Sequence, residues 1–158
     1  MHQRAKEFET RAEERYGFDV DVHEFPEGTK TAEDAADAIG CDVAQIASSL
    51  VFRADGDLVI AVTSGANRVS EEKLAALLDV PASGVGMANA DAIREAVGWS
   101  IGGVPPFCHD ADVPVYLDET LTDFETVWAA AGTPKAVFPI APEELKTYAE
   151  ATVTDVTE

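Results

Sequence analysis

The chain has 158 residues, 46% of them hydrophobic, and it carries 30 acidic against 11 basic side chains, for a formal net charge of −19. A chain of this length forms one compact domain, residues 1–158, and buries most of the surface exposed when unfolded. The charge is the reverse of the basic surface typical of nucleic-acid-binding proteins, and no apolar run reaches the ~20 residues of a membrane-spanning helix. Composition therefore argues against membrane insertion and against broad electrostatic binding of nucleic acid.

The acidic residues are spread over nearly every polar segment, and only five of the basic residues are lysine. This pattern is typical of proteins that work in concentrated salt, where the Debye length falls to roughly 3 Å and the charge repels little beyond contact. An acidic surface that binds a partner is the alternative. We predict a halophilic protein.

Two cysteines, Cys41 and Cys108, are present, and neither has the spacing of a metal site. The first 18 residues contain no apolar segment of signal-peptide type. These features predict a reduced, cytoplasmic protein that binds no metal.

The first 40 residues predict a helix, a strand and a second helix. Apolar residues repeat on one helical face before Gly17, which is placed to end that helix. Residues 18–25 alternate between apolar and polar, as in a half-buried strand, and this places His23 on the solvated face. Thr31 is a candidate N-cap for a helix with a small-residue face that Gly40 ends.

Residues 48–54 and 57–64 predict two strands joined by Asp55-Gly56, a dipeptide that favours a tight hairpin turn. Both strands are apolar on both faces, which indicates the centre of a sheet.

The remaining elements continue the mixture of helices and strands. Ser70 caps a predicted helix with Leu74, Leu77 and Leu78 inside, and Asn89 caps another that ends at Gly98. A short strand is possible within 80–88, further strands are predicted at 113–117, 126–132 and 135–140, and a last helix at 141–151. The absence of a regular βαβ alternation favours an α+β fold: a mixed, mostly antiparallel sheet, or a partly closed barrel, flanked by helices.

Residues 98–110, GWSIGGVPPFCHD, form the least regular segment. Pro105 and Pro106 exclude a helix interior or a central strand there. Gly102 and Gly103 allow backbone N–H groups to approach a ligand closely, and the prolines stiffen the loop that carries them. Preorganised amides of this kind form an oxyanion hole that polarises an ester carbonyl. A connection without a ligand is the alternative.

Other catalytic signals are weak. Thirty acidic residues make any spacing of carboxylates uninformative, and the chain contains no G-x-S-x-G, Walker or H-E-x-x-H motif. Cys108 and His109 could form a thiol nucleophile and its base, but neighbouring side chains rarely reach the required geometry. A loop cysteine without a covalent role is the alternative.

Taken together, the order of these segments resembles the YbaK family, whose domain is also associated with prolyl-tRNA synthetase and removes wrongly attached amino acids from tRNA. The similarity runs from about Thr29 to Leu145 and rests on KTAEDAADAIGCDVAQIASSLVF, SGANRVSEEKLAALL, GWSIGGVPPF, VPVYLDETL and AAAGTPKAVFPIAPEEL. The family's Gly-x-x-x-Pro motif corresponds to Gly102–Pro106, its aspartate after the next strand to Asp118, and its later glycine to Gly132.

The resemblance implies an α+β fold around a small pocket for the aminoacyl ester at the tRNA 3′ end, with no cofactor. It implies a deacylase acting in trans, with Gly102 and Gly103 as amide donors, Pro106 shaping the loop and Ser48 at the pocket mouth. The residues expected to contact substrate are Ser49, Val104, Phe107, Cys108, Asp118, Gly132, Thr133 and Arg68.

Some positions depart from the family pattern. Many members carry a lysine where this chain has Ser48, and a serine cannot offer positive charge to a phosphate or carbonyl. Pro105 replaces a common serine, and Cys108 stands at the family's small residue. Asp118 has a strand-end cap as its alternative, and Arg68 a solvated turn. A binding module that kept the pocket but lost turnover is therefore the rival function. The sequence does not predict the oligomeric state.

Overall fold

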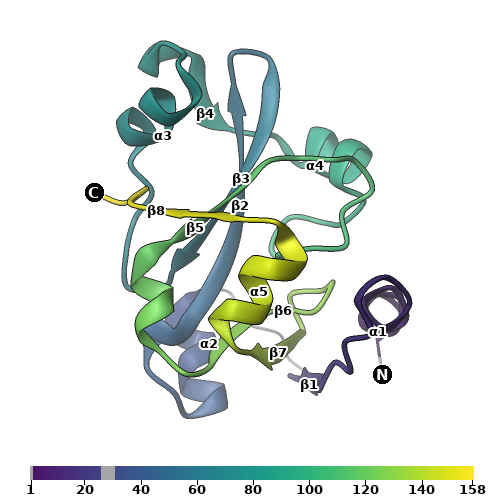
Figure 1. Ribbon diagram of the computed structural model, residues 1–158. Coiled ribbons are helices and arrows are strands. Elements are labelled where there is room, and N and C mark those ends of the chain that lie inside the picture. Colours follow the sequence, from purple (N-terminus) through teal and green to yellow (C-terminus); the bar gives the residue numbers. More distant parts are fainter. Residues whose placement is uncertain (1, 26–30) are drawn as a thin grey trace.

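Residues 2–25 and 31–158 are described by the computed structural model, in which eight strands form one sheet with helices packed around it (Figure 1). Thr29 and Lys30, where the YbaK resemblance begins, lie outside the described residues. The strands are β1 (His23–Glu24), β2 (Ile46–Ala54), β3 (Asp57–Ser64), β4 (Val85–Met87), β5 (Val115–Asp118), β6 (Val127–Ala130), β7 (Ala136–Ile140) and β8 (Thr152–Thr154). The helices are α1 (Gln3–Tyr16), α2 (Ala32–Ile39), α3 (Glu71–Leu78), α4 (Ala90–Val97) and α5 (Pro142–Ala149).

The β2–β3 hairpin is the centre of the sheet, as predicted. Asp55 and Gly56 have φ values of 51° and 94°, the positive values that a two-residue hairpin turn requires. β3 is buried at every position from Val59 to Ser64, because β2 and β5 flank it and side chains pack on both faces.

The sheet is mixed and open. Its order is β1-β7-β6-β2-β3-β5-β8, with β4 beside β2, and the pairs β2–β6, β3–β5 and β5–β8 are parallel. The end strands β1 and β8 have no pairing with one another in the described residues. The barrel alternative is therefore wrong, and the open α+β sheet is confirmed.

Local capping signals predicted the helix ends well. The side chains of Thr31, Ser70 and Asn89 each accept a hydrogen bond from the backbone N–H three residues later, and Gly17, Gly40 and Gly98 end their helices with positive φ. These contacts satisfy backbone groups that a helix leaves unpaired.

Two predictions about these elements were wrong, and one strand was not predicted. Leu77 is 41% exposed because the buried face of α3 runs through Leu74 and Ala75. The strand at 18–25 shortens to His23–Glu24, the only part that pairs with β7. β8 was not predicted, since its three residues form a strand only by pairing with β5.

Helix α1 packs through aromatic side chains against the loop 98–110. Phe8 is fully buried, and its ring centroid lies 5.5 Å from that of Phe107 and 5.0 Å from that of Phe138. Trp99, also fully buried, meets Phe8 edge-on and carries the Arg4 guanidinium 4.2 Å above its ring. The irregular loop is therefore held by side-chain packing rather than by a strand ladder.

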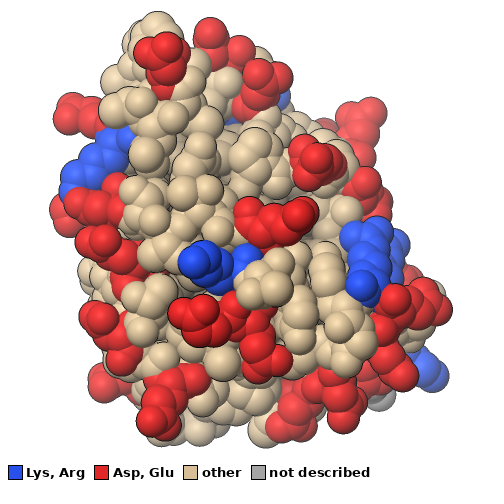
Figure 2. Space-filling view, viewed as in Figure 1, with Lys and Arg blue, Asp and Glu red and all other residues tan. Residues whose placement is uncertain are grey.

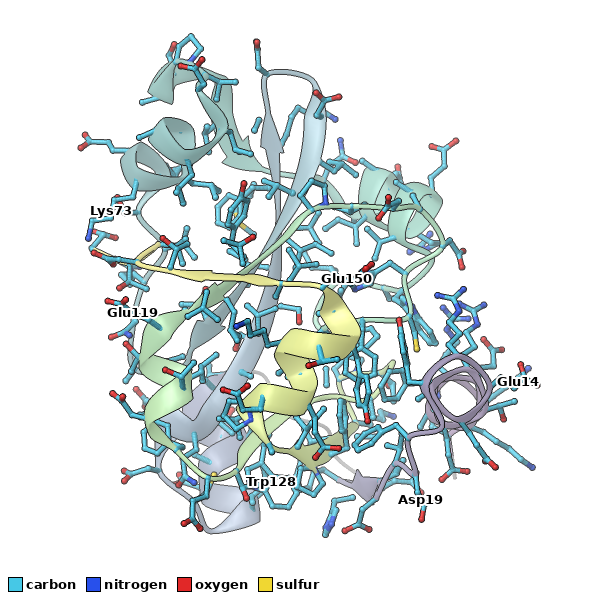
Figure 3. All side chains as sticks on the ribbon, viewed as in Figure 1. Glu14, Asp19, Lys73, Glu119, Trp128 and Glu150 are labelled. Atoms are coloured by element: carbon cyan, nitrogen blue, oxygen red, sulfur yellow. The ribbon has the colours of Figure 1, made fainter. Side chains whose placement is uncertain are left out.

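The acidic side chains cover the visible surface without forming one patch (Figure 2). The side chains of Glu14, Asp19 and Glu119 project outward at the edges of the view (Figure 3). In the described residues, no helix is long and apolar enough to cross a bilayer.

Candidate active site

A pocket of about 250 Å³ lies between β2, the loop that carries Gly102, and the turn that follows β6. Its lining comes from β2, α2, β4, α4, β6, β7 and these two connections. The lining residues are Thr31, Ala32, Ala35, Ile46, Ala47, Ser48, Ser49, Leu50, Val51, Met87, Ile93, Ile101, Gly102, Val104, Trp128, Ala129, Ala130, Thr133, Pro134, Ala136 and Val137. None of the described lining residues is charged, so the pocket excludes the protein's own acidic groups.

One edge of β2 is unpaired where it lines the pocket. On that edge β6 registers only with Ile46 and Ala47, and β4 registers only with Phe52–Ala54. The gap between them spans residues 48–51. A central strand therefore presents a short free edge to the pocket.

Strand alternation identifies which backbone groups face this gap. The N–H of Gly65 donates to the carbonyl of Ile46 at 2.8 Å, so the even-numbered residues of β2 bond to β3. Ser49 therefore directs its N–H and C=O to the opposite edge, where neither β6 nor β4 registers with it. The carbonyl of Val51 is already used, because it accepts from the Ala88 N–H at 3.1 Å.

The Ser49 side chain adds a third polar group. Its Oγ is buried and has no hydrogen-bond partner in the described residues, a feature it shares with Thr63 Oγ1. An unsatisfied buried hydroxyl costs roughly 1–3 kcal/mol, so native proteins rarely keep one without a use. Ser49 lines the pocket and Thr63 does not. Ser48, which was expected at the pocket mouth, also lies in the lining.

The loop wall differs from the prediction at Gly103. The Gly103 N–H donates to the Ser100 carbonyl at 3.0 Å, so it is not a donor to a ligand. A Cβ on Gly103 would lie 2.6 Å from the Thr133 Cα, which means that this glycine permits close contact between two loops. Gly102 and Val104 do line the pocket, and their N–H groups have no acceptor in the described residues.

Pro106, Phe107 and Cys108 lie behind the pocket wall, outside its lining. Phe107 packs in the aromatic cluster, and the carbonyl of Cys108 accepts from Trp99 Nε1 at 2.9 Å. The predicted substrate contacts of Phe107 and Cys108 are therefore not formed, because both residues face the core. Pro106 is buried and can shape the wall only from behind.

The thiol alternative loses its support in this geometry. Burial raises the pKa of the Cys108 thiol to about 11, so the nucleophilic thiolate is scarce at neutral pH. The His109 Nε2 lies 2.7 Å from the Pro105 carbonyl, and burial lowers the pKa of the imidazole. Neither residue belongs to the pocket lining.

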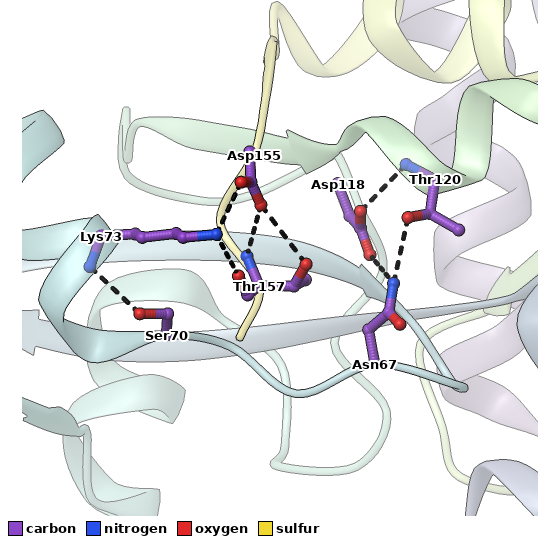
Figure 4. Close-up of polar contacts among 7 residues, drawn as sticks. All are labelled: Asn67, Ser70, Lys73, Asp118, Thr120, Asp155 and Thr157. Carbon is purple, nitrogen blue, oxygen red and sulfur yellow. Dashed lines mark hydrogen bonds and ion pairs between the residues drawn. The ribbon is translucent and has the colours of Figure 1, made fainter.

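Asp118 acts as a strand-end cap, the alternative to a substrate contact that the sequence left open. The fully buried carboxylate accepts hydrogen bonds from the Ser64 N–H at 3.0 Å, from Asn67 Nδ2 at 3.1 Å and from the Thr120 N–H at 2.9 Å. Figure 4 shows the Asn67 and Thr120 contacts. Asp118 therefore joins the ends of β3 and β5 and does not reach the pocket.

Gly132 and Arg68 also lie outside the pocket lining. Gly132 has φ 92°, and a Cβ there would lie 2.7 Å from Trp99 Cζ3 and 2.8 Å from the Arg4 carbonyl. This glycine allows α1 and Trp99 to pack on the turn that carries Thr133. Arg68 is exposed, and its carbonyl accepts from the Glu158 N–H.

Thr133, one of the expected substrate contacts, lies in the pocket lining, and its Oγ1 accepts from the Lys135 N–H at 3.3 Å. Apart from Val104, sequence reasoning missed the apolar part of the lining, including Met87, Ile101 and Trp128. No local signal separates these side chains from ordinary core or surface positions. They meet only through tertiary structure.

The geometry defines a small α+β domain with an uncharged pocket over a free strand edge. Residues 26–148 match the model of the aminoacyl-tRNA editing domain family, and the chain belongs to that family. The match confirms the YbaK-type resemblance.

Individual relatives extend the comparison. YwhH, an uncharacterized protein of Bacillus subtilis strain 168, is 36% identical over 129 residues, covering 81% of this chain and 80% of that protein. The proline–tRNA ligase of Lysinibacillus sphaericus strain C3-41 is 31% identical over 102 residues, which are 65% of this chain but only 18% of the ligase. A crystal structure of a proposed trans-editing enzyme for prolyl-tRNA synthetase superimposes with a TM-score of 0.93 and 38% identity, covering 100% of this chain and 99% of the other.

Proposed function

We propose that this protein hydrolyses the ester between a wrongly attached amino acid and the 3′ end of its tRNA, as a trans-acting editing enzyme in the cytoplasm. The observation that carries the proposal is the pocket itself, where unpaired main-chain groups meet the buried Ser49 hydroxyl in an uncharged lining. The family membership and the similarity to a proposed trans-editing enzyme support it.

In the proposed reaction, a water oxygen attacks the ester carbonyl carbon, the bond to the tRNA oxygen breaks, and that oxygen leaves with a proton. The free amides of Gly102 and Val104 stabilise the negative charge that develops on the carbonyl oxygen. The Ser49 carbonyl accepts a hydrogen bond from the α-ammonium group of the substrate. Because no described lining residue is charged, the proton of the attacking water passes to solvent or to a group of the substrate itself.

The direct test is amino-acid release from a panel of mischarged and correctly charged tRNAs in molar potassium chloride. Gly102→Ala places a side chain at φ 86° on the pocket wall, whereas Gly56→Ala places one at φ 94° in the distant hairpin, with no atom nearby. Alanine keeps the backbone N–H but is strained at φ 86°, so the substitution displaces this donor. Loss of one oxyanion donor costs ~10²–10³ in rate, so we expect Gly102→Ala alone to lose that activity. Absence of selective hydrolysis by folded wild-type protein refutes the proposal.

Ser49 offers a second test with its own matched control. Ser49→Ala and Thr63→Val each remove one unpartnered hydroxyl, and neither change should destabilise the fold, because each removes an unsatisfied buried group. We expect hydrolysis to fall about tenfold or more in Ser49→Ala and to be unchanged in Thr63→Val. Equal activity in both variants would exclude the Ser49 hydroxyl from the reaction, while its main-chain carbonyl would stay in place.

The rival function is a non-catalytic module that binds an aminoacyl group, and Ser48 is the observation that favours it. Ser48 lines the pocket at the position where the resemblance expects lysine. Ser48→Lys distinguishes the two functions. An active enzyme is disturbed or little changed by the added charge, whereas a module that has lost turnover gains hydrolysis.

A further inference from the structure

The rim of the pocket exposes apolar side chains. Among the described residues, the exposed large hydrophobic side chains are Leu77, Met87 and Ile101, at 41%, 55% and 54% exposure. Met87 and Ile101 both line the pocket, and Leu77 does not. They come from different elements, since Met87 ends β4 and Ile101 lies in the loop beside Gly102. Exposed apolar side chains at the mouth of a pocket, on an otherwise acidic protein, indicate a binding surface.

The chemistry of the rim indicates what part of a substrate it contacts. Its described residues offer no positive charge for a phosphate, and the chain as a whole carries −19. In an aminoacyl-tRNA the amino acid is joined to the ribose of the terminal adenosine. With the amino acid in the pocket, the group immediately outside is therefore this nucleoside, whose base is uncharged, flat and largely apolar on its faces.

We infer that Ile101 and Met87 form a subsite for the terminal adenine base, which packs on their exposed side chains. Trp128, half-buried in the same lining, extends the apolar surface. Stacking and apolar contact need no positive charge on the protein. Such a subsite therefore lets an acidic protein bind one end of an RNA without a basic patch. This inference rests on the proposed function, because the occupant of the pocket determines what lies at its rim.

The test measures adenosine binding and needs no hydrolysis. The sequence contains only two methionines, so a protein labelled with ¹³C at the methionine methyl groups gives a simple spectrum in which Met87 reports on the rim. We expect adenosine to move the Met87 signal upfield through the ring current of the base. Ile101→Ser should weaken adenosine binding about tenfold or more, the value of one base contact.

Leu77→Ser is the matched control, because it removes an exposed apolar side chain away from the pocket. Binding that is unchanged in Ile101→Ser, or absent from the wild type at millimolar adenosine, overturns the inference. Self-association of the wild type that Ile101→Ser abolishes also overturns it, since the rim would then contact a second copy of the chain.

Failure of the proposed function gives a different result. Aminoacyl-tRNA then remains intact with every variant, whatever the adenosine titration shows. If hydrolysis occurs, its kcat/KM supplies a second measurement: Ile101→Ser should slow cleavage of an aminoacyl adenosine but not of the methyl ester of the same amino acid. Equal slowing of both esters would assign Ile101 to the amino-acid pocket instead.

Discussion

Gly103→Ala tests the contact between the two loops that form the pocket wall. The added Cβ would lie 2.6, 2.8 and 2.9 Å from the Cα, N and C atoms of Thr133. Nonbonded carbon atoms prefer about 3.5–4.0 Å, so the loops must separate by about 1 Å. Thr133 cannot yield easily, because its carbonyl accepts from the Ala136 N–H and its Oγ1 from the Lys135 N–H.

Overpacking of this kind costs about 1–3 kcal/mol, and each ~1 kcal/mol lowers Tm by about 2–4 °C in a domain of this size. A displacement of about 1 Å in a positioned group can reduce the rate ~10²-fold. We therefore expect Gly103→Ala to lower both Tm, followed by calorimetry, and the deacylation rate. Gly86→Ala is the control, since no atom lies within 4 Å of its added Cβ. A Gly103→Ala variant with unchanged Tm and full activity would refute the reasoning.

Further predictions concern groups outside the pocket. Cys108→Ser should retain hydrolysis in a release assay, because burial keeps the thiol protonated, and a large loss with the fold intact would restore the thiol mechanism. Burial lowers the pKa of His109 below the value of the unfolded chain. The stability that the neutral imidazole contributes is therefore present above about pH 6.5 and is lost as the pH falls below that. His109→Gln should reduce the slope of the free energy of unfolding against pH, measured by denaturant titration. Lys73 Nζ bonds to Asp155 and to the Thr157 carbonyl, both at 2.6 Å (Figure 4), so Lys73→Met should lower Tm in dilute salt but not in molar potassium chloride.

The features that the sequence predicted correctly are those set by interactions between residues close together in the chain. Thr31, Ser70 and Asn89 cap helices through contacts within four residues, and Asp55-Gly56 sets its turn by backbone preference alone. Such signals need no knowledge of the rest of the chain. The strand β8 and the exposure of Leu77 depend on distant partners, so β8 was not predicted and Leu77 was wrongly placed inside.

The site was predicted only in part for the same reason. Gly102 and Thr133, both expected at the site, lie in the pocket lining, whereas the Gly103 N–H, expected to face a ligand, donates to the Ser100 carbonyl. The sequence cannot distinguish a glycine that exposes its N–H to a ligand from a glycine that allows a neighbouring loop to pack closely. Asp118 was ambiguous in the same way, and only its three hydrogen bonds resolve the choice.

The pocket combines main-chain groups on the free edge of β2, which depend on strand register, with side chains, which depend on residue identity. The N–H and C=O that Ser49 presents exist because β6 and β4 register with other parts of the strand. A point substitution replaces a side chain but leaves that register in place. A lining side chain can therefore change, as at Ser48, where the family resemblance leads one to expect lysine, while the main-chain groups on the pocket floor stay in place. Substitutions in the lining can therefore change which amino acid the pocket accepts without changing the main-chain groups that contact it.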